Sequence, residues 1–265
     1  MIFQESGKSL TTKGIGTMRS GLISPEACPA GVRQPRSIDP PMELLVSFPA
    51  PYDASDGIKA YTQLGLRLYD PLIVGLLARH VWQCPAETFI AAYRTHLRAN
   101  HADVGVGTGY CLDQCGFDVP APRLALIDLQ PNCLGFTARR LSRYRPETYL
   151  RDARQPLLGI PAFDSVALGG LLHCLPGDMR EKAAVFDALR PICNPGATVF
   201  GFTLVNDAIA ATRSRRLAWR ALNDLRVVNC RDDTADGLRH ELAARFDDCT
   251  VETIGCFAFF SARVH

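Results

Sequence analysis

The chain has 265 residues and a formal net charge of +2 at pH 7, and 47% of its residues are hydrophobic. This length and composition are sufficient for one large globular domain with a buried core. The small net charge and the lack of basic runs argue against a nucleic-acid partner. The longest apolar run, at 72–78, is much shorter than the roughly 20 residues of a membrane-spanning helix, so we expect no membrane partner.

Ten cysteines are scattered along the chain without a C-x-x-C pair or metal-ligand spacing. We expect no signal peptide before them and no metal site. This usage predicts reduced thiols in a cytoplasmic protein.

The first hundred residues divide into an arm and a cap. Residues 1–41 mix Gly, Ser, Thr and Pro without a helical or strand period, which predicts a flexible N-terminal arm. Residues 42–100 are expected to form a helical cap, because apolar residues recur there three and four positions apart. Pro71 is suited to the first turn of one of these helices.

From residue 101 to the end at residue 265, short apolar runs alternate with helical segments. This rhythm predicts an α/β fold in which a doubly wound, mostly parallel sheet is covered by helices on both faces. A longer helical insertion is expected over about 207–247. The five expected strands are 102–106, 123–129, 165–172, 197–205 and 251–264.

Three glycines follow the first expected strand, at Gly105, Gly107 and Gly109. Glycines at this position let a ligand approach the backbone closely. About 20 residues further on, the second strand ends in Asp128, whose carboxylate is suited to the two hydroxyls of a ribose. Tyr110 stands where a dinucleotide fingerprint needs glycine, and no P-loop motif occurs. The pattern therefore indicates a nucleoside ligand.

At this point the sequence resembles the class I S-adenosylmethionine-dependent methyltransferases, in the subgroup that acts on small molecules. The resemblance covers about residues 60–265 and consists of motifs in the family's order. Gly170 and Cys174 depart from the subgroup's fourth motif, in which Asn and His are common. The matching segments are "ADVGVGTG", "LALIDLQPNCL", "YLRDARQPL", "FDSVALGGLLHCLPGD" and "LRPICNPGATVFGFTLV".

The resemblance implies a Rossmann-like domain over 101–265 with an antiparallel last strand, and S-adenosylmethionine as cofactor. The resemblance implies that Asp128 binds the ribose hydroxyls and that Asp152 binds the adenine amino group. It also implies that an N-terminal tyrosine, Tyr61 or Tyr69, binds the methionyl carboxylate. The residues expected to bind the cofactor are Asp103, Gly105, Gly107, Thr108, Gly109, Asp128, Leu129, Asp152, Ala153, Gly169, Gly170, Tyr61 and Tyr69.

The resulting hypothesis is transfer of a methyl group by in-line displacement to an O or N atom of a small aromatic or heterocyclic metabolite, in secondary metabolism. His173 is the candidate general base, and Tyr52, His173 and Trp219 are candidates for the acceptor pocket. A homodimer is left open, by analogy with this fold alone. The main alternative keeps the cofactor and uses it for a rearrangement or elimination, while a non-catalytic scaffold and a nicotinamide oxidoreductase fit less well.

The same residues also have purely structural interpretations. Asp128 reads as a helix N-cap, because a helix start follows it. His173 reads as a hydrogen-bonded core histidine, and Tyr61 and Tyr69 as core residues on one helix face.

Overall fold

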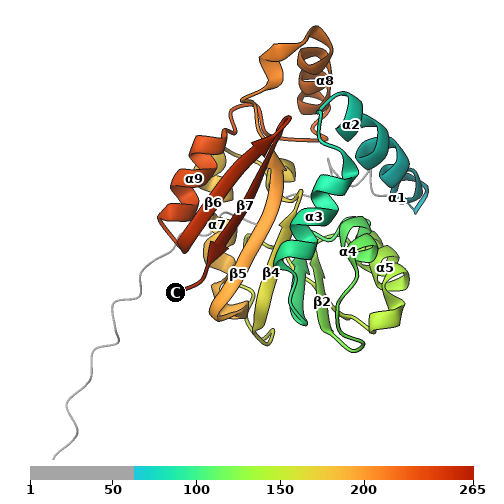
Figure 1. The fold of residues 1–265 in the computed structure, drawn as a ribbon, viewed down its shortest axis with the longest axis vertical. Coiled ribbons are helices and arrows are strands. Elements are labelled where there is room, and N and C mark those ends of the chain that lie inside the picture. Colours follow the sequence, from blue (N-terminus) through green and yellow to red (C-terminus); the bar gives the residue numbers. More distant parts are fainter. Residues whose placement is uncertain (1–62) are drawn as a thin grey trace, which may run out of the picture. The chain divides into compact units, whose positions relative to one another are not determined.

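The computed structural model describes residues 63–265, and its centre is a seven-stranded sheet in the order β3-β2-β1-β4-β5-β7-β6 (Figure 1). Every neighbouring pair from β3 to β5 is parallel, whereas β7 is antiparallel to both of its neighbours. The expected mostly parallel sheet with an antiparallel last strand is therefore confirmed. The strands are β1 Asn100–Val104, β2 Arg123–Asp128, β3 Glu147–Leu150, β4 Phe163–Gly169, β5 Cys193–Leu204, β6 Asp247–Ile254 and β7 Phe257–Arg263.

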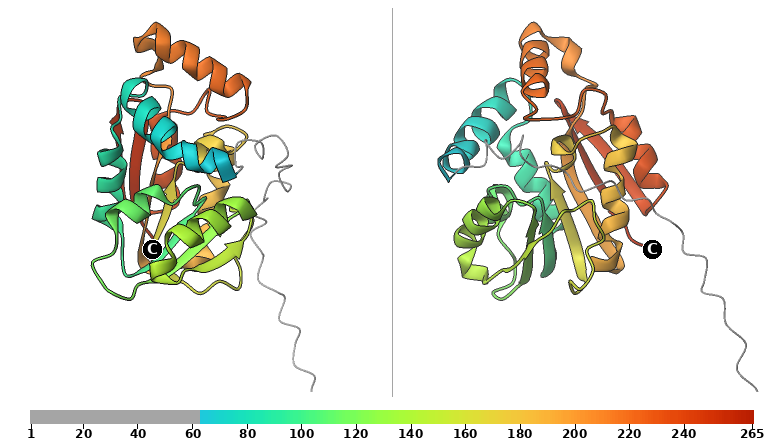
Figure 2. Two further views of the ribbon diagram at one scale, coloured as in Figure 1. Left: turned by 90° about the vertical axis from the view of Figure 1, so that its right-hand side faces the viewer. Right: turned by 180° about the vertical axis from the view of Figure 1, so that it is seen from behind.

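Helices cover both faces of this sheet (Figures 1 and 2). One face packs against α3, α4 and α5, and the other against α6, α7 and α9. Alternate residues of a strand serve the two faces, so that Leu124 and Leu126 point to the first layer while Ala125 and Ile127 point to the second. The helical segments are α1 Gln63–Tyr69, η2 Asp70–Leu77, α2 Ala78–His80, α3 Ala86–His96, α4 Tyr110–Cys115, α5 Pro131–Arg140, η3 Ser142–Tyr144, η4 Leu172–Cys174, α6 Met179–Lys182, α7 Ala184–Leu189, η5 Arg190–Ile192, η6 Ile209–Ala211, α8 Arg213–Asp224 and α9 Ala235–Ala243.

The last expected strand is in fact a hairpin. The run 251–264 contains the end of β6, a turn, and the whole of β7. Gly255 makes the turn with φ +60°, and a Cβ at that position would lie 2.1 Å from the carbonyl oxygen of Trp82. A period-2 apolar pattern continues through the turn, which is why it reads as one strand.

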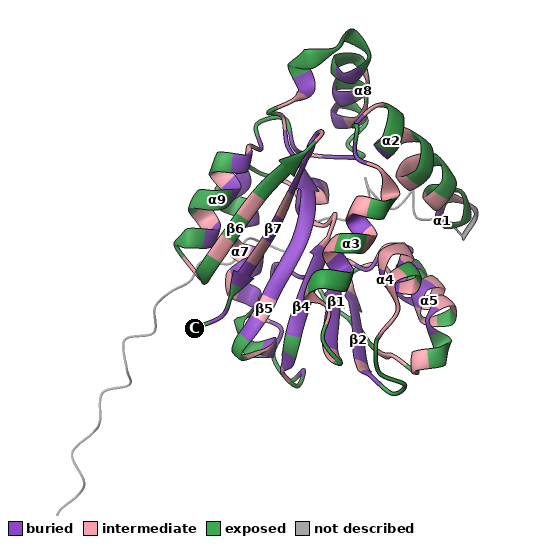
Figure 3. Ribbon diagram, in the orientation of Figure 1, coloured by how far each residue is buried: buried purple, intermediate pink, exposed green. Residues whose placement is uncertain are grey.

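The segment between β5 and β6, expected as one helical insertion, contains two helices with different surroundings. Helix α9 packs against β6 and α6, with Leu238 and Leu242 fully buried on the sheet. Helix α8 lies beside α2 (Figures 1 and 3), where Trp219 meets Trp82 edge to face at 6.2 Å. Arg215 also donates to the carbonyl oxygen of Val81. The segment therefore contains α9, which packs on the sheet, and α8, which packs against the residues that follow α2.

The helices before β1 include an uncommon element. The segment η2 is a π-helix of eight residues with Pro71 as its second residue. It continues α1 without a break, so Pro71 does not open a separate helix as the sequence suggested. Within residues 63–265 no helix has the length and hydrophobicity needed to cross a bilayer.

Candidate functional site

A cavity of about 850 Å³ lies where β1, β2, β4 and β5 end. Pockets that hold a drug-sized ligand measure roughly 300 to 1,000 Å³, so this cavity is near the upper end of that range. Its walls come from the loops after these strands, from α1 and η2, and from the segment that follows α8. In an open α/β sheet this is the edge at which ligands bind.

The loop after β1 lines one half of the cavity, and its glycines serve different purposes. A Cβ on Gly109 would lie 2.5 Å from Cγ2 of Thr137, and a Cβ on Gly105 would lie 2.8 Å from Cδ1 of Leu171. Gly107 has φ +51°, and a Cβ there would meet no atom within 4 Å. Packing thus explains Gly105 and Gly109, whereas Gly107 leaves bare backbone facing open space, as a closely bound ligand requires.

Asp103 lies at the base of this loop, 3% exposed, with its carboxylate facing Tyr93. The Tyr93 hydroxyl donates to both carboxylate oxygens, at 3.2 and 3.3 Å. Burial raises the pKa of Asp103 to about 7, although the hydrogen bond from Tyr93 opposes the shift. Tyr93 was missed by sequence reasoning, since it stands on α3, where apolar spacing predicted only core packing.

Asp128, at the end of β2, accepts the backbone N–H of Gln130 at 2.7 Å. Gln130 itself is the N-cap of α5 and makes no side-chain cap. Burial raises the pKa of Asp128 to about 6, while backbone N–H groups around it, including those of Gln130 and Gly107, oppose the shift. Asp128 and Leu129 both line the cavity. The carboxylate therefore helps to order the start of α5 and also faces the ligand space.

Asp152 follows β3 and lines the same half, together with Ala153. Arg154, which sequence analysis did not single out, donates Nη2 to Asp152 Oδ2 at 2.8 Å and Nε to Oδ1 at 3.2 Å. Both side chains are largely buried. The guanidinium fixes the orientation of the carboxylate at the cavity wall.

His173 lies in η4, just after β4, where Gly169 and Gly170 also line the cavity. Its Nδ1 accepts the backbone N–H of Leu204 at 3.2 Å and lies 3.4 Å from the Thr203 hydroxyl. Burial, assisted by the charge of Lys182, lowers the pKa of His173 to about 3. Because Nδ1 must be unprotonated to accept, the neutral ring carries its proton on Nε2.

The expected role of His173 as a general base stays a prediction, and this tautomer does not favour it. Nδ1 is engaged by the backbone, and Nε2 already holds a proton. A Cβ on Gly170 would lie 3.8 Å from Nε2 of His173, which places this nitrogen beside the cavity wall at the end of β4. In this tautomer the Nε2–H of His173 is available to donate a hydrogen bond.

The other half of the cavity is apolar. Leu66, Ile73, Val74 and Leu77 from α1 and η2 line this half, together with aromatic residues. Among these aromatic residues, Phe89 and Phe202 lie 4.5 Å apart, and Phe89 and Phe257 lie 4.8 Å apart.

The expected tyrosines and tryptophan have different outcomes. Tyr69 lines the cavity at the end of α1. Tyr52 and Tyr61 lie outside the described residues. Trp219 packs against Trp82, is 7% exposed and is not among the residues that line the cavity, so the structure does not support the expected contact with an acceptor, which stays a prediction.

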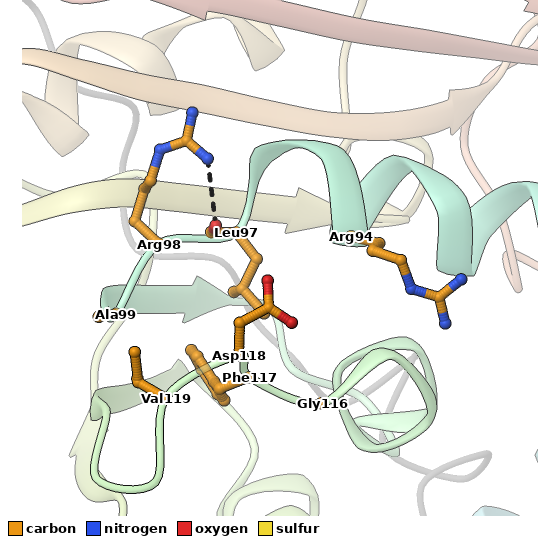
Figure 4. A pocket seen from close by; sticks show the side chains of 8 residues that line it. All are labelled: Arg94, Leu97, Arg98, Ala99, Gly116, Phe117, Asp118 and Val119. Carbon is orange, nitrogen blue, oxygen red and sulfur yellow. Dashed lines mark hydrogen bonds between the residues drawn. The ribbon is translucent and has the colours of Figure 1, made fainter.

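A second, smaller cavity of about 250 Å³ lies before the start of β1 (Figure 4). It is lined by Arg94 and by residues 97–99 and 116–119, and Arg98 there donates to the carbonyl oxygen of Leu97 at 3.3 Å. None of the expected site residues lies in it. In residues 63–265, no group of three or more His, Cys, Asp or Glu is placed to hold a metal ion.

The fold and the large cavity together define an α/β protein with a cavity at the carboxyl edge of its sheet. The chain is 36% identical to demethylluteothin O-methyltransferase of Streptomyces thioluteus over 208 residues, which are 78% of this chain and 90% of that protein. It is 30% identical to methyltransferase verB of Penicillium polonicum, over 77% of this chain and 96% of that protein.

Solved structures match the same fold. The human N-acetylserotonin methyltransferase in complex with S-adenosylmethionine has a TM-score of 0.56 and 17% identity, over 80% of this chain and 60% of that one. No family model matches the chain. On the strength of its curated relatives, this chain belongs to the class I S-adenosylmethionine-dependent methyltransferases.

Proposed function

We propose that the large cavity binds S-adenosylmethionine in its polar half and a small aromatic or heterocyclic acceptor in its apolar half. The observation that carries this proposal is the order of Asp103, the glycine loop, Asp128 and Asp152 around one cavity that continues into an apolar chamber. Asp128 would hold the ribose hydroxyls, Asp152 the adenine amino group, and Asp103 the cationic amino group. Gly107 fits this ligand, because its bare backbone faces open space.

The bound cofactor supplies an electrophilic methyl carbon on a sulfonium centre. The protein's own task is to orient an acceptor atom toward that carbon and to exclude water, since positioning can supply most of the acceleration. Phe89, Phe202 and Phe257 suit a flat acceptor, because their rings lie against one another along one wall.

An oxygen acceptor is favoured over nitrogen by His173. A donated Nε2–H stabilises an oxygen that carries negative charge, whereas it opposes the positive charge that a neutral nitrogen acceptor gains as it is methylated. We therefore propose that His173 orients an acidic hydroxyl, phenolic or enolic, that has already lost its proton when it reaches the site. The S. thioluteus and Aspergillus chevalieri relatives are named O-methyltransferases, although the Penicillium aethiopicum relative is named an N-methyltransferase.

Calorimetric titration with S-adenosylhomocysteine tests the cofactor site. We expect micromolar binding that Asp128→Ala weakens by about 1 to 3 kcal/mol, the range for a hydrogen-bonded carboxylate. Asp118→Asn is the matched control, because Asp118 is an exposed carboxylate at the smaller cavity. Absence of binding to the unaltered protein would overturn the proposal.

The alternative, a non-methylating reaction of the bound cofactor, is separated by following the methyl group. Incubation with methyl-labelled S-adenosylmethionine and a panel of phenols, enols and N-heterocycles should move label onto an acceptor. A product that forms while the label stays on the cofactor would favour the alternative.

We also propose a cytoplasmic protein with no nucleic-acid partner, and a homodimer. The nine described cysteines, all free thiols, support a reducing compartment. Light scattering after size exclusion tests the dimer, and a thiol count on the native protein tests the redox state.

A further inference from the structure

A network of short hydrogen bonds joins the cap to the glycine loop at Asp70, the first residue of η2. The Thr108 hydroxyl donates to Asp70 Oδ1 at 2.6 Å, and Arg140 Nη2 donates to Asp70 Oδ2 at 2.6 Å. Arg140 closes the network by donating Nη1 to the carbonyl oxygen of Thr108 at 2.8 Å. Three separate elements, η2, the glycine loop and α5, therefore meet at one carboxylate.

The network is shielded from water. Only 13% of the Asp70 side chain and 24% of the Arg140 side chain are exposed. Charged partners at such distances form the stronger class of hydrogen bond, and partial burial reduces screening by salt. Arg140 also contacts both partners of the Asp70–Thr108 hydrogen bond, and it therefore fixes their relative position.

The two ends of the network belong to different halves of the cavity. Thr108 lines the polar half beside Gly107, whereas Ile73, Val74 and Leu77, which follow Asp70 on η2, form part of the apolar wall. A shift of η2 relative to the glycine loop would break the bonds of Asp70 and displace the apolar wall in the same movement.

We propose that Asp70 and Arg140 are positioning residues that couple cofactor binding to the ordering of the acceptor wall. When a ligand fixes the glycine loop, Thr108 and Arg140 hold Asp70, and η2 becomes the fixed side of the acceptor chamber. Because such coupling is reciprocal, an ordered acceptor wall also strengthens cofactor binding. This inference rests on the proposed function for the identity of the cofactor.

Hydrogen exchange on the full-length protein tests the coupling without knowledge of the acceptor. In the unaltered protein we expect S-adenosylhomocysteine to slow exchange of the amides at 72–78 by about tenfold, and also to slow exchange at 129–134. In Asp70→Ala, the ligand should still slow exchange at 129–134 but lose its effect at 72–78. Equal slowing at 72–78 in both proteins would overturn the proposal.

Two further variants make the result specific. Asp118→Asn is the matched control: Asp118 is an exposed carboxylate at the smaller cavity and outside this network, so its loss should leave 72–78 coupled. Thr108→Val should mimic Asp70→Ala, and the double variant should add little to either.

Hydrogen exchange without ligand separates the proposed coupling from the proposed cofactor binding. Asp70→Ala alone should speed exchange at 72–78 about tenfold, and an unchanged rate would count against the network. If the unaltered protein does not bind S-adenosylhomocysteine, the proposed function and the ligand coupling both fail. If it binds and 72–78 does not respond, only the coupling fails.

Discussion

Asp103 is a buried carboxyl group, and a cationic ligand would stabilise its ionised form. Its pKa is raised to about 7, chiefly by burial. In the ligand-free protein, the raised pKa means that the folded state binds a proton at Asp103 more tightly than the unfolded state does. This contribution to the free energy of unfolding is fully present below the unfolded-state pKa near 4, and it is lost as the pH rises through about 7. A bound amino group reverses this preference, because it stabilises the ionised form and expels the proton.

S-adenosylhomocysteine affinity should therefore depend on pH through Asp103. We expect the Kd to rise about tenfold as the pH falls from 8 to 6, because ligand binding must then displace a proton held near pH 7. Calorimetry in buffers of different ionisation enthalpy would detect the released proton. In Asp103→Asn the affinity should be weak at every pH, and an equally steep pH dependence in that variant would contradict the assignment.

His173 is expected to act through its donated hydrogen bond. His173→Phe should lower kcat/KM for an identified acceptor about 10- to 100-fold, the effect of one hydrogen bond to a charged group, and leave S-adenosylhomocysteine affinity unchanged. With a pKa near 3, this imidazole does not titrate between pH 5 and 8, so rates in that range should follow ionisation of the acceptor. If kcat/KM instead changed around one common pH for acceptors of different acidity, the result would support His173 as the general base.

At the scale of elements, the segment after α8 is held against the active edge by a buried ion pair. Lys182 on α6 donates to the Asp233 carboxylate and to the carbonyl oxygen of Asn229, and both charged side chains are almost fully buried. Asn229 in turn donates its backbone N–H to the carbonyl oxygen of His173 at 2.7 Å. The pair thus ties the last part of the cavity wall to η4.

Removing one charge of this pair should be costly. Lys182→Met leaves Asp233 buried and unpaired, and we expect a loss of about 3 to 5 kcal/mol in the free energy of unfolding, measured with urea. Lys182→Met combined with Asp233→Leu should recover much of that loss, because no uncompensated charge remains. Equal losses in the single and double variants would show that packing, and not charge, dominates.

The elements around the glycine loop were the most predictable from sequence. Strands β1, β2, β4 and β5, with Asp103 on β1 and Asp128 at the end of β2, follow from apolar runs and motif spacing, which are local signals. Tyr93, Arg154 and the Asp70–Arg140 pair could not be found this way. Each acts through a side-chain contact, and nothing local distinguishes Asp70 from any other helix-start carboxylate. His173 shows a further limit, since its tautomer depends on a backbone N–H 31 residues away.

For the whole molecule, ligand binding should appear as added thermal stability. A ligand at 100 times its Kd stabilises the native state by about 2.7 kcal/mol, which for a chain of this size raises Tm by about 5 to 10 °C. Thermal melts with S-adenosylhomocysteine measure the shift. Asp128→Ala should show a smaller one at the same ligand concentration, and an unshifted melt of the unaltered protein would contradict the proposed cofactor.

One of the two outermost strands, β6, limits how two copies of this sheet can meet. Its sequence, "DDCTVETI", places Asp247, Asp248 and Glu252 along the border of the sheet. Its pairing with β7 is irregular between Asp247 and Thr250, and Asp248 has φ +46°. Two such borders brought together would oppose like charges on strands of irregular register. Growth into fibres by strand addition is therefore discouraged here, and self-association at this border would have to use other surfaces.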